Sequence, residues 1–121
     1  MSISRQNLSV IIVSFKSDHV IHRCISSIDK EIEIIVIENS NNTKLKKDIE
    51  EQYENVKCIL SSENIGMGAG NNIGIKNTNK DFAFILNPDV ILEKNTIDES
   101  IGASQSLDSF GVSAPVSDKL E

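Results

Sequence analysis

The sequence feature that most constrains the fold is a series of apolar runs, each as long as a single strand. Leu8–Ser14 and Ile32–Ile37 are almost uninterrupted and rich in β-branched residues. Such runs are typical of strands that are buried on both faces, as in a parallel sheet. Val56–Leu60 and Phe82–Leu86 predict two more strands, and Phe110–Val116 predicts a fifth.

Amphipathic segments separate these runs and predict a helix after each of the first four strands. Ser17 or Asp18 can cap the first helix, and Thr43 can cap the second. The third is expected over about residues 68–77 and the fourth over about residues 96–107. Strands that alternate with helices form right-handed βαβ units on a parallel sheet. We therefore expect one α/β domain over residues 1–121, a three-layer Rossmann-like fold with helices on both faces of a mostly parallel sheet.

Composition excludes several classes of protein. The net charge of −6 argues against a nucleic-acid partner, because binding to phosphates needs a concentrated basic surface. The longest apolar runs are only strand-sized, so we expect no transmembrane helix. The first nine residues lack the apolar segment of a signal peptide, and a cytoplasmic location is the default expectation. Cys24 and Cys58 lie among apolar neighbours and are expected to be reduced core residues.

Four of the six glycines lie between Gly66 and Gly74. They do not form the dinucleotide-binding fingerprint G-x-G-x-x-G, because Asn71 stands at the position of its third glycine. The stretch also follows the third strand, whereas that fingerprint follows the first, so a nicotinamide or flavin enzyme is not expected. Two interpretations stay open. The glycines serve turns and close backbone packing, or they let a ligand approach bare amides at a helix start.

The tripeptide Asn87-Pro88-Asp89 directly follows the fourth predicted strand. Asn and Pro are common turn residues, so the simplest interpretation is a turn that ends the strand. The alternative is that Asp89 binds a divalent cation, because Mg²⁺ is often held by one or two carboxylates together with substrate phosphates. Ligands of open α/β sheets bind outside the carboxyl ends of the strands, which is where this aspartate lies.

Four stretches resemble a known family: VIIVSFK at residues 10–16, IVIENS at 35–40, ENIGMGAGNNIG at 63–74 and LNPDV at 86–90. They are similar to the nucleotide-sugar-binding half of family-2 glycosyltransferases with the GT-A fold. The similarity is closest to the rhamnosyltransferase-like branch. The last two stretches, at their mutual spacing, are the more specific ones, and GVSAPV at 111–116 is similar to the strand that follows in such enzymes.

The resemblance implies a donor-binding site made of residues that follow strands or lie near the start of the third helix. These residues are Ser14, Phe15, Lys16, Glu38, Asn39, Asn64, Gly66, Asn71, Asn72, Asn87 and Asp89. The three residues after the first strand would line the nucleotide pocket. Glu38 stands where the family usually has an aspartate that hydrogen-bonds the nucleobase edge, and it is one methylene longer.

The other residues of this set would surround the sugar diphosphate. Asn64 and Gly66 would shape the pocket wall, and Asn71 and Asn72 would face the ribose and diphosphate. Asn87 and Asp89 occupy the Asp-x-Asp position of the family. There the last carboxylate binds Mg²⁺ or Mn²⁺. Since Asn87 replaces the first acidic residue, Asp89 is the one charged ligand expected from this motif.

The implied function is the binding of a UDP- or dTDP-linked sugar for inverting transfer to an acceptor hydroxyl. A glycan or lipid-linked acceptor is expected, as in polysaccharide biosynthesis. The acceptor-binding half, which in this family supplies the general base, has no counterpart before Glu121, so no catalytic residue is assigned. The alternative is a non-catalytic nucleotide-binding or assembly domain that kept the fold. In either case uncovered apolar surface predicts a homo-oligomer.

Overall fold

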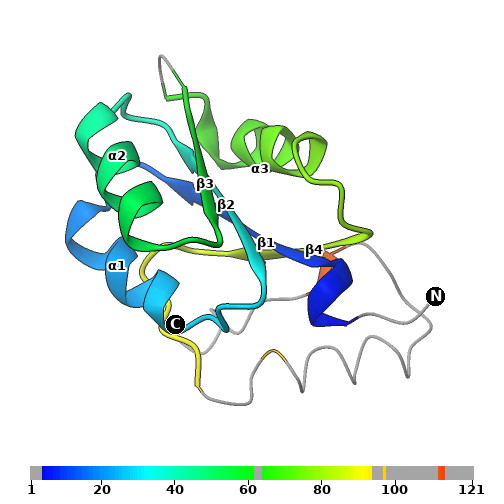
Figure 1. Cartoon of the computed structure of the whole chain (residues 1–121). Coiled ribbons are helices and arrows are strands. Elements are labelled where there is room, and N and C mark those ends of the chain that lie inside the picture. Colours follow the sequence, from blue (N-terminus) through cyan, green and yellow to red (C-terminus); the bar gives the residue numbers. More distant parts are fainter. Residues whose placement is uncertain (1–3, 62–63, 94–96, 98–111, 114–121) are drawn as a thin grey trace.

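The computed structural model describes residues 4–61, 64–93, 97 and 112–113 (Figure 1). A short 3₁₀ helix precedes an alternation of strands and helices. In chain order the elements are η1 (Arg5–Asn7), β1 (Leu8–Ser14), α1 (Asp18–Ser26), β2 (Glu33–Glu38), α2 (Thr43–Gln52), β3 (Val56–Leu60), α3 (Gly66–Lys76), β4 (Phe82–Leu86) and β5 (Val112–Ser113).

All described strands are parallel, in the order β3-β2-β1-β4-β5. The chain winds outward from β1 through β2 to β3, then returns to place β4 on the other side of β1. The direction of winding therefore reverses between β1 and β4. In open α/β sheets, the crevice beyond the carboxyl ends of the strands at such a point is where ligands bind.

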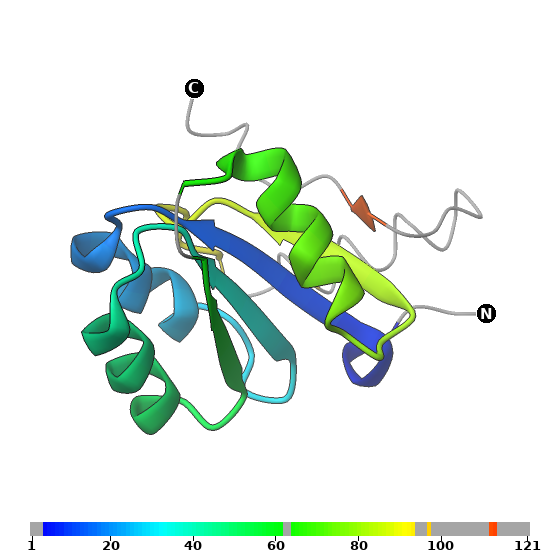
Figure 2. The ribbon, with the colours of Figure 1, turned by 90° about the horizontal axis from the view of Figure 1, so that it is seen from above.

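Helices cover both faces of the sheet, as predicted (Figure 2). Alternate residues of β1 point to opposite faces. Val10 and Ile12 pack in the cluster under α1 and α2, whereas Ile11 and Val13 belong to the cluster under α3. The two apolar clusters explain why β1 is an unbroken apolar run, and they confirm the three-layer α/β prediction.

The predicted strand bounds agree closely with the structure. The first, third and fourth strands begin and end as expected, and β2 lies one residue later, so that Glu38 is its last residue. Of the predicted fifth strand, Val112–Ser113 is observed in β5, and the remainder lies outside the described residues. The helix expected over about residues 96–107 also lies outside them, apart from the buried Ile97.

Two predicted helix starts differ from the structure by one or two residues. Asn42, not Thr43, caps α2, because its side-chain oxygen accepts a hydrogen bond from the Leu45 N–H at 2.9 Å. The third helix begins at Gly66, two residues before the expected start, so the first glycines of the motif are already helical. Ser17 does occupy the cap position of α1, but its hydroxyl donates to the Phe15 carbonyl instead.

The structure also bears on the membrane and cysteine predictions. Within the described ranges, no helix has both the length and the apolar character needed to cross a bilayer. Cys24 and Cys58 are free and buried, as predicted.

Candidate functional site

Three buried polar residues lie at the carboxyl ends of β1 and β2. Ser14 pairs with Glu38 in the sheet register, and both are fully buried, while Asn39 is 2% exposed. Within the described residues, one oxygen of each side chain has no hydrogen-bond partner: Ser14 Oγ, Glu38 Oε1 and Asn39 Oδ1. Unpaired buried polar atoms are uncommon in folded proteins and need an explanation. Because they are grouped at the carboxyl ends of the strands, this end of the sheet is the candidate ligand site.

The two carboxylate oxygens of Glu38 have different surroundings. Oε2 accepts hydrogen bonds from the Ser40 N–H at 2.8 Å, the Ser40 hydroxyl at 2.6 Å and the Asn42 N–H at 3.0 Å. These bonds hold the loop that leads into α2. Oε1 is the oxygen left without a partner. Any contact between Glu38 and a ligand is therefore expected through Oε1, while Oε2 serves the loop.

The loop after β1 presents two exposed side chains. Phe15 is 44% exposed, and the Lys16 ammonium lies 5.3 Å from the centre of its ring. Lys16 has a φ of 55°, in the left-handed region that residues other than glycine seldom adopt. The family resemblance implies that both residues line a nucleotide pocket, which stays a prediction; in the structure they directly follow Ser14 at the carboxyl end of β1.

Asn39 connects the end of β2 to the start of α3. Its side-chain nitrogen donates to Asn64 Oδ1 at 3.5 Å and to the Gly66 carbonyl at 3.4 Å. Asn64 Oδ1 also accepts from the Gly66 N–H at 3.1 Å. Gly66 has a φ of +85°, which a residue with a Cβ adopts only with strain. The structure thus joins Asn39, Asn64 and Gly66, which the sequence placed in one pocket.

The remaining glycines divide between the two interpretations. A Cβ on Gly70 would lie 2.9 Å from both methyl groups of Val13, and one on Gly74 would lie 2.5 Å from Cγ2 of Ile11. These two glycines let α3 approach β1, as the packing interpretation predicts. A Cβ on Gly68 would meet nothing within 4 Å, so approach of a ligand stays a prediction for the start of the helix.

Asn71 and Asn72 lie on the second turn of α3 and differ in environment. Asn71 is half-buried and its Oδ1 is buried without a partner, whereas Asn72 is exposed. Neighbouring positions of a helix diverge by about 100° around its axis. The two amides therefore do not face one ligand equally, and Asn71 is the one whose unpaired atom invites a contact.

The turn that carries Asp89 rests on α1. The Asn87 carbonyl accepts from the Val90 N–H at 3.2 Å and from the Cys24 thiol at 3.6 Å. The Leu92 N–H donates to Ser27 Oγ at 3.0 Å, and the side chains of Val90 and Leu92 are buried. The turn is therefore fixed in place while Asp89 itself is exposed.

Two anchors of this turn, Cys24 and Ser27, were missed at the level of sequence. They lie more than 60 residues before the groups they bind, as the separations of 63 and 65 residues show. No local pattern could have found them. Burial, with the nearby charge of Asp89 adding to it, raises the pKa of the Cys24 thiol to about 12.

The donor set around Asp89 fits a cation that is shared with a substrate. Within the described residues, no group of three or more His, Cys, Asp or Glu side chains could hold a metal by itself. Asp89 is exposed. A single free carboxylate suits Mg²⁺, which commonly takes one or two protein carboxylates and completes its coordination with phosphates and water.

Two surface hollows lie outside this set of residues. One of about 370 Å³ is lined by Lys30, Gln52, Tyr53, Glu54 and Asn55. Another of about 390 Å³ lies beside α2 and is lined by Thr43, Lys46, Lys47, Glu50, Glu51 and Leu60. Neither includes a residue predicted from the sequence to bind the donor. The candidate site is therefore identified by unpaired polar atoms and sheet topology.

The chain as a whole is similar to known proteins. The sequence model of the family described as Glycosyl transferase family 2 matches residues 9–113. The chain is 33% identical over 104 residues to the low-salt glycan biosynthesis hexosyltransferase Agl10 of Haloferax volcanii, covering 83% of this chain and 33% of that protein.

The fold is also similar to that of S. aureus TarS. The crystal structure of TarS 1–349 matches with a TM-score of 0.67 at 19% identity, covering 83% of this chain and 32% of that one. A second TarS crystal structure matches with a TM-score of 0.65 at 17% identity, covering 83% of this chain and 20% of that one. The fold is thus the Rossmann-like one of GT-A type, and the chain spans a third or less of the length of these proteins.

Proposed function

This chain belongs to glycosyl transferase family 2, and from that premise we propose that it is the donor-binding part of a glycosyltransferase. It binds a nucleoside-diphosphate sugar together with Mg²⁺ or Mn²⁺. The sugar then passes, with inversion, to a hydroxyl of a glycan or lipid-linked acceptor.

The observation that supports this proposal most is the arrangement at the reversal point between β1 and β4. Ser14, with its buried and unpaired Oγ, ends β1. Asp89, with its exposed carboxylate, follows the end of β4. Because β1 and β4 are neighbours, we expect the two groups to flank the crevice where α/β sheets bind ligands. A hydroxyl and a carboxylate on opposite sides suit a ligand with a polar nucleoside and a charged diphosphate.

We assign the nucleoside to the β1 and β2 side of this crevice. The Oε1 atom of Glu38 is a hydrogen-bond acceptor, so it matches a base that offers an N–H. Uracil and thymine both carry such a group, so the UDP- or dTDP-linked donor that the family resemblance implies is compatible with this oxygen. The exposed ring of Phe15 offers an apolar surface for a base to pack on.

We assign the diphosphate to the start of α3 and the turn of Asp89. The amino end of a helix carries free N–H groups and a partial positive charge, both of which favour phosphate oxygens. Lys16 adds an exposed positive charge at the same end of the sheet. Asp89 would hold the metal ion, which when bound supplies neutralisation of the charge that develops on the leaving nucleoside diphosphate.

The proposal covers donor binding, with the acceptor chemistry left to other groups. An inverting transfer needs a base that removes the proton of the acceptor hydroxyl. We assign no described residue to that role, and the comparison proteins are about three times as long as this chain. The 121-residue chain alone is therefore expected to bind the donor weakly and to transfer sugar slowly or not at all.

Calorimetric titration of the chain with UDP and with dTDP, with and without Mn²⁺, tests the proposal. Heat of binding that depends on Mn²⁺ is expected with at least one of the two nucleotides. ADP tests the preference for the base, because the only N–H donors of its adenine are those of the exocyclic amino group. Absence of metal-dependent heat with every nucleotide would overturn the assignment.

The second candidate is a non-catalytic assembly domain, and exposed apolar side chains favour it. Phe15, Met67, Ile75 and Ile91 are 44%, 51%, 41% and 51% exposed. Contact with a second copy of the chain would cover such surface. Light scattering over a range of concentrations tests this candidate. A dimer or larger oligomer that binds no nucleotide is its expected result, and a monomer at high concentration would contradict it.

A further inference from the structure

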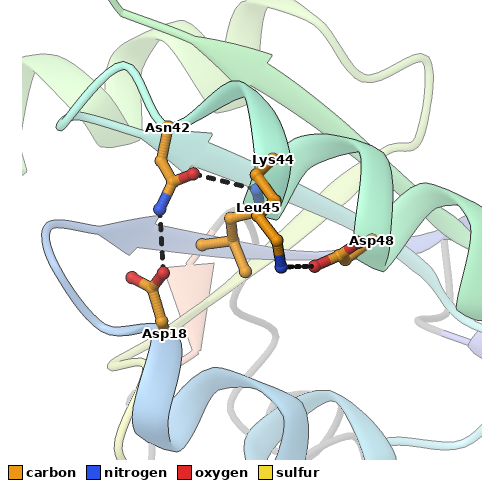
Figure 3. A network of polar contacts seen from close by, with 5 residues as sticks. All are labelled: Asp18, Asn42, Lys44, Leu45 and Asp48. Atoms are coloured by element: carbon orange, nitrogen blue, oxygen red, sulfur yellow. Dashed lines mark hydrogen bonds and ion pairs between the residues drawn. The ribbon is translucent and has the colours of Figure 1, made fainter.

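One hydrogen bond joins the beginnings of α1 and α2 beside the candidate site. The side-chain nitrogen of Asn42 donates to Asp18 Oδ2 at 2.8 Å, as Figure 3 shows. Asn42 also uses its side-chain oxygen to cap α2 through the Leu45 N–H. Asp18 is the first residue of α1 and Asn42 is the last before α2, so this bond spans the two loops that follow β1 and β2.

We propose that Asp18 and Asn42 form a clamp that positions the loop of Phe15 and Lys16 for the nucleotide. This inference rests on the proposed function, since that loop lines the nucleotide pocket only if the chain binds a nucleotide. Neither residue of the clamp belongs to the donor site itself. Both are positioning residues, which act through the loops they join.

The strained backbone of Lys16 is the reason why the loop needs support. A lysine with a φ of 55° is held in a conformation that costs free energy, and such residues persist only where neighbouring contacts fix them. The contacts come from the neighbouring loop. The Lys16 N–H donates to Ser40 Oγ at 3.4 Å, which is a long bond, and the clamp follows two residues later.

The clamp also continues from Glu38. Oε2 of Glu38 accepts from the N–H groups of Ser40 and Asn42, so the carboxylate orders the loop that carries the Asn42 side chain. A series of hydrogen bonds thus runs from the end of β2 through Asn42 to Asp18. These bonds hold the loop after β1 in place on the side that faces β2.

Exchange of the two side chains tests the clamp. Asn42→Asp keeps a good cap for α2 but sets two carboxylates against each other, so the bond is lost. The double variant Asp18→Asn with Asn42→Asp restores one amide and one carboxylate. We expect the single variant to weaken binding of UDP or dTDP in Mn²⁺ about tenfold, the factor that 1.4 kcal/mol gives. The double variant is expected to recover most of the loss.

Asp48→Asn is the matched control. Asp48 pairs with Lys44 at 3.1 Å on the exposed side of α2, close to the clamp but without a contact to it (Figure 3). Its loss should leave nucleotide affinity unchanged. If Asn42→Asp and Asp18→Ala both keep the wild-type affinity while folded, the pair only stabilises the fold and the proposal is overturned.

Hydrogen exchange separates failure of the clamp from failure of the proposed function. Without ligand, the Lys16 amide should exchange faster in Asn42→Asp and return towards the wild-type rate in the double variant. Unchanged exchange in the single variant would overturn the clamp, whatever the binding data show. A wild-type chain that binds no nucleotide would overturn the proposed function instead, and the exchange rates alone would then decide whether the clamp exists.

Discussion

Gly74 of α3 lies so close to Ile11 of β1 that an added Cβ would come within 2.5 Å of the isoleucine Cγ2. Real Cβ contacts are never that short, and Ile11 is fully buried in the central strand. The side chain of Ile11 has no free space to move into, because protein interiors are close-packed. Gly74 therefore sets the distance between α3 and the sheet.

Gly74→Ala is expected to destabilise the chain by about 1–3 kcal/mol, the usual cost of overpacking a core. Gly68→Ala is the control on the same helix, because a Cβ there meets nothing within 4 Å. That change should be neutral or stabilising by up to about 1 kcal/mol, since alanine is the better helix former. Urea unfolding measures both. Equal losses of stability in the two variants would contradict the packing account.

The glycines show how far a sequence can go in this case. Their clustering from Gly66 to Gly74 indicated an unusual backbone conformation or a close backbone contact. Spacing alone could not decide whether the glycines serve helix packing or the approach of a ligand. That distinction depends on Val13 and Ile11, which lie more than 50 positions earlier in the chain and are recognisable only as apolar residues. The strands were predictable because a strand that is buried on both faces has a continuous run of apolar residues in its own sequence.

The candidate site was predictable to a smaller extent. The family resemblance supplied Ser14, Glu38 and Asp89 as candidates. It did not reveal that one oxygen of Glu38 is committed to its own loop. The clamp of Asp18 and Asn42 was also missed, because a hydrogen bond between residues 24 positions apart produces no recognisable pattern in the sequence.

The two cysteines are expected to be unreactive in the folded chain. Burial raises the pKa of the Cys24 thiol and of the Cys58 thiol to about 12 in each case. The thiolate is the reactive form, so both residues should resist a disulfide reagent at neutral pH and react fully after unfolding in denaturant. Titration of the native chain measures this. Fast reaction of one thiol in the native chain would show that its burial is wrong.

Glu50 is expected to make the free energy of unfolding depend on pH in the acidic range. Burial alone would raise its pKa, but the Cys58 N–H at 2.8 Å and the Lys46 ammonium at 2.9 Å outweigh burial and lower it below the ordinary 4.5. The ionised form is thus favoured by folding. The contribution of Glu50 is complete above pH 4.5 and is lost as the pH falls through its lowered pKa.

Denaturant unfolding over a series of pH values measures this contribution. Glu50→Gln should be less stable than the wild type at neutral pH, and the difference should shrink in strong acid. Glu51→Gln, an exposed neighbour on α2, should change little at either pH. A difference that stays constant with pH would contradict the role given to the carboxylate.

The side chains of Lys46 and Glu50 also cover the outer edge of strand β3. β3 is the outermost described strand on its side, and the Lys46 ammonium donates to the Cys58 carbonyl at 2.7 Å while Glu50 accepts from the Cys58 N–H. Open strand edges invite pairing with other chains. The double variant Lys46→Ala with Glu50→Ala should therefore self-associate more than the wild type in light scattering. An unchanged molar mass would contradict this role.

The central claim is that Asp89 holds a metal ion shared with a nucleoside diphosphate. Calorimetry of Asp89→Asn against Asp81→Asn tests it most directly, because both changes remove one exposed carboxylate. Asp81 lies just before β4, at the amino ends of the strands and so at the opposite end of the sheet from Asp89. The account predicts that Asp89→Asn loses the Mn²⁺-dependent part of UDP or dTDP binding, while Asp81→Asn keeps it. Retention of metal-dependent binding by Asp89→Asn, or equal loss in both variants, would contradict the account.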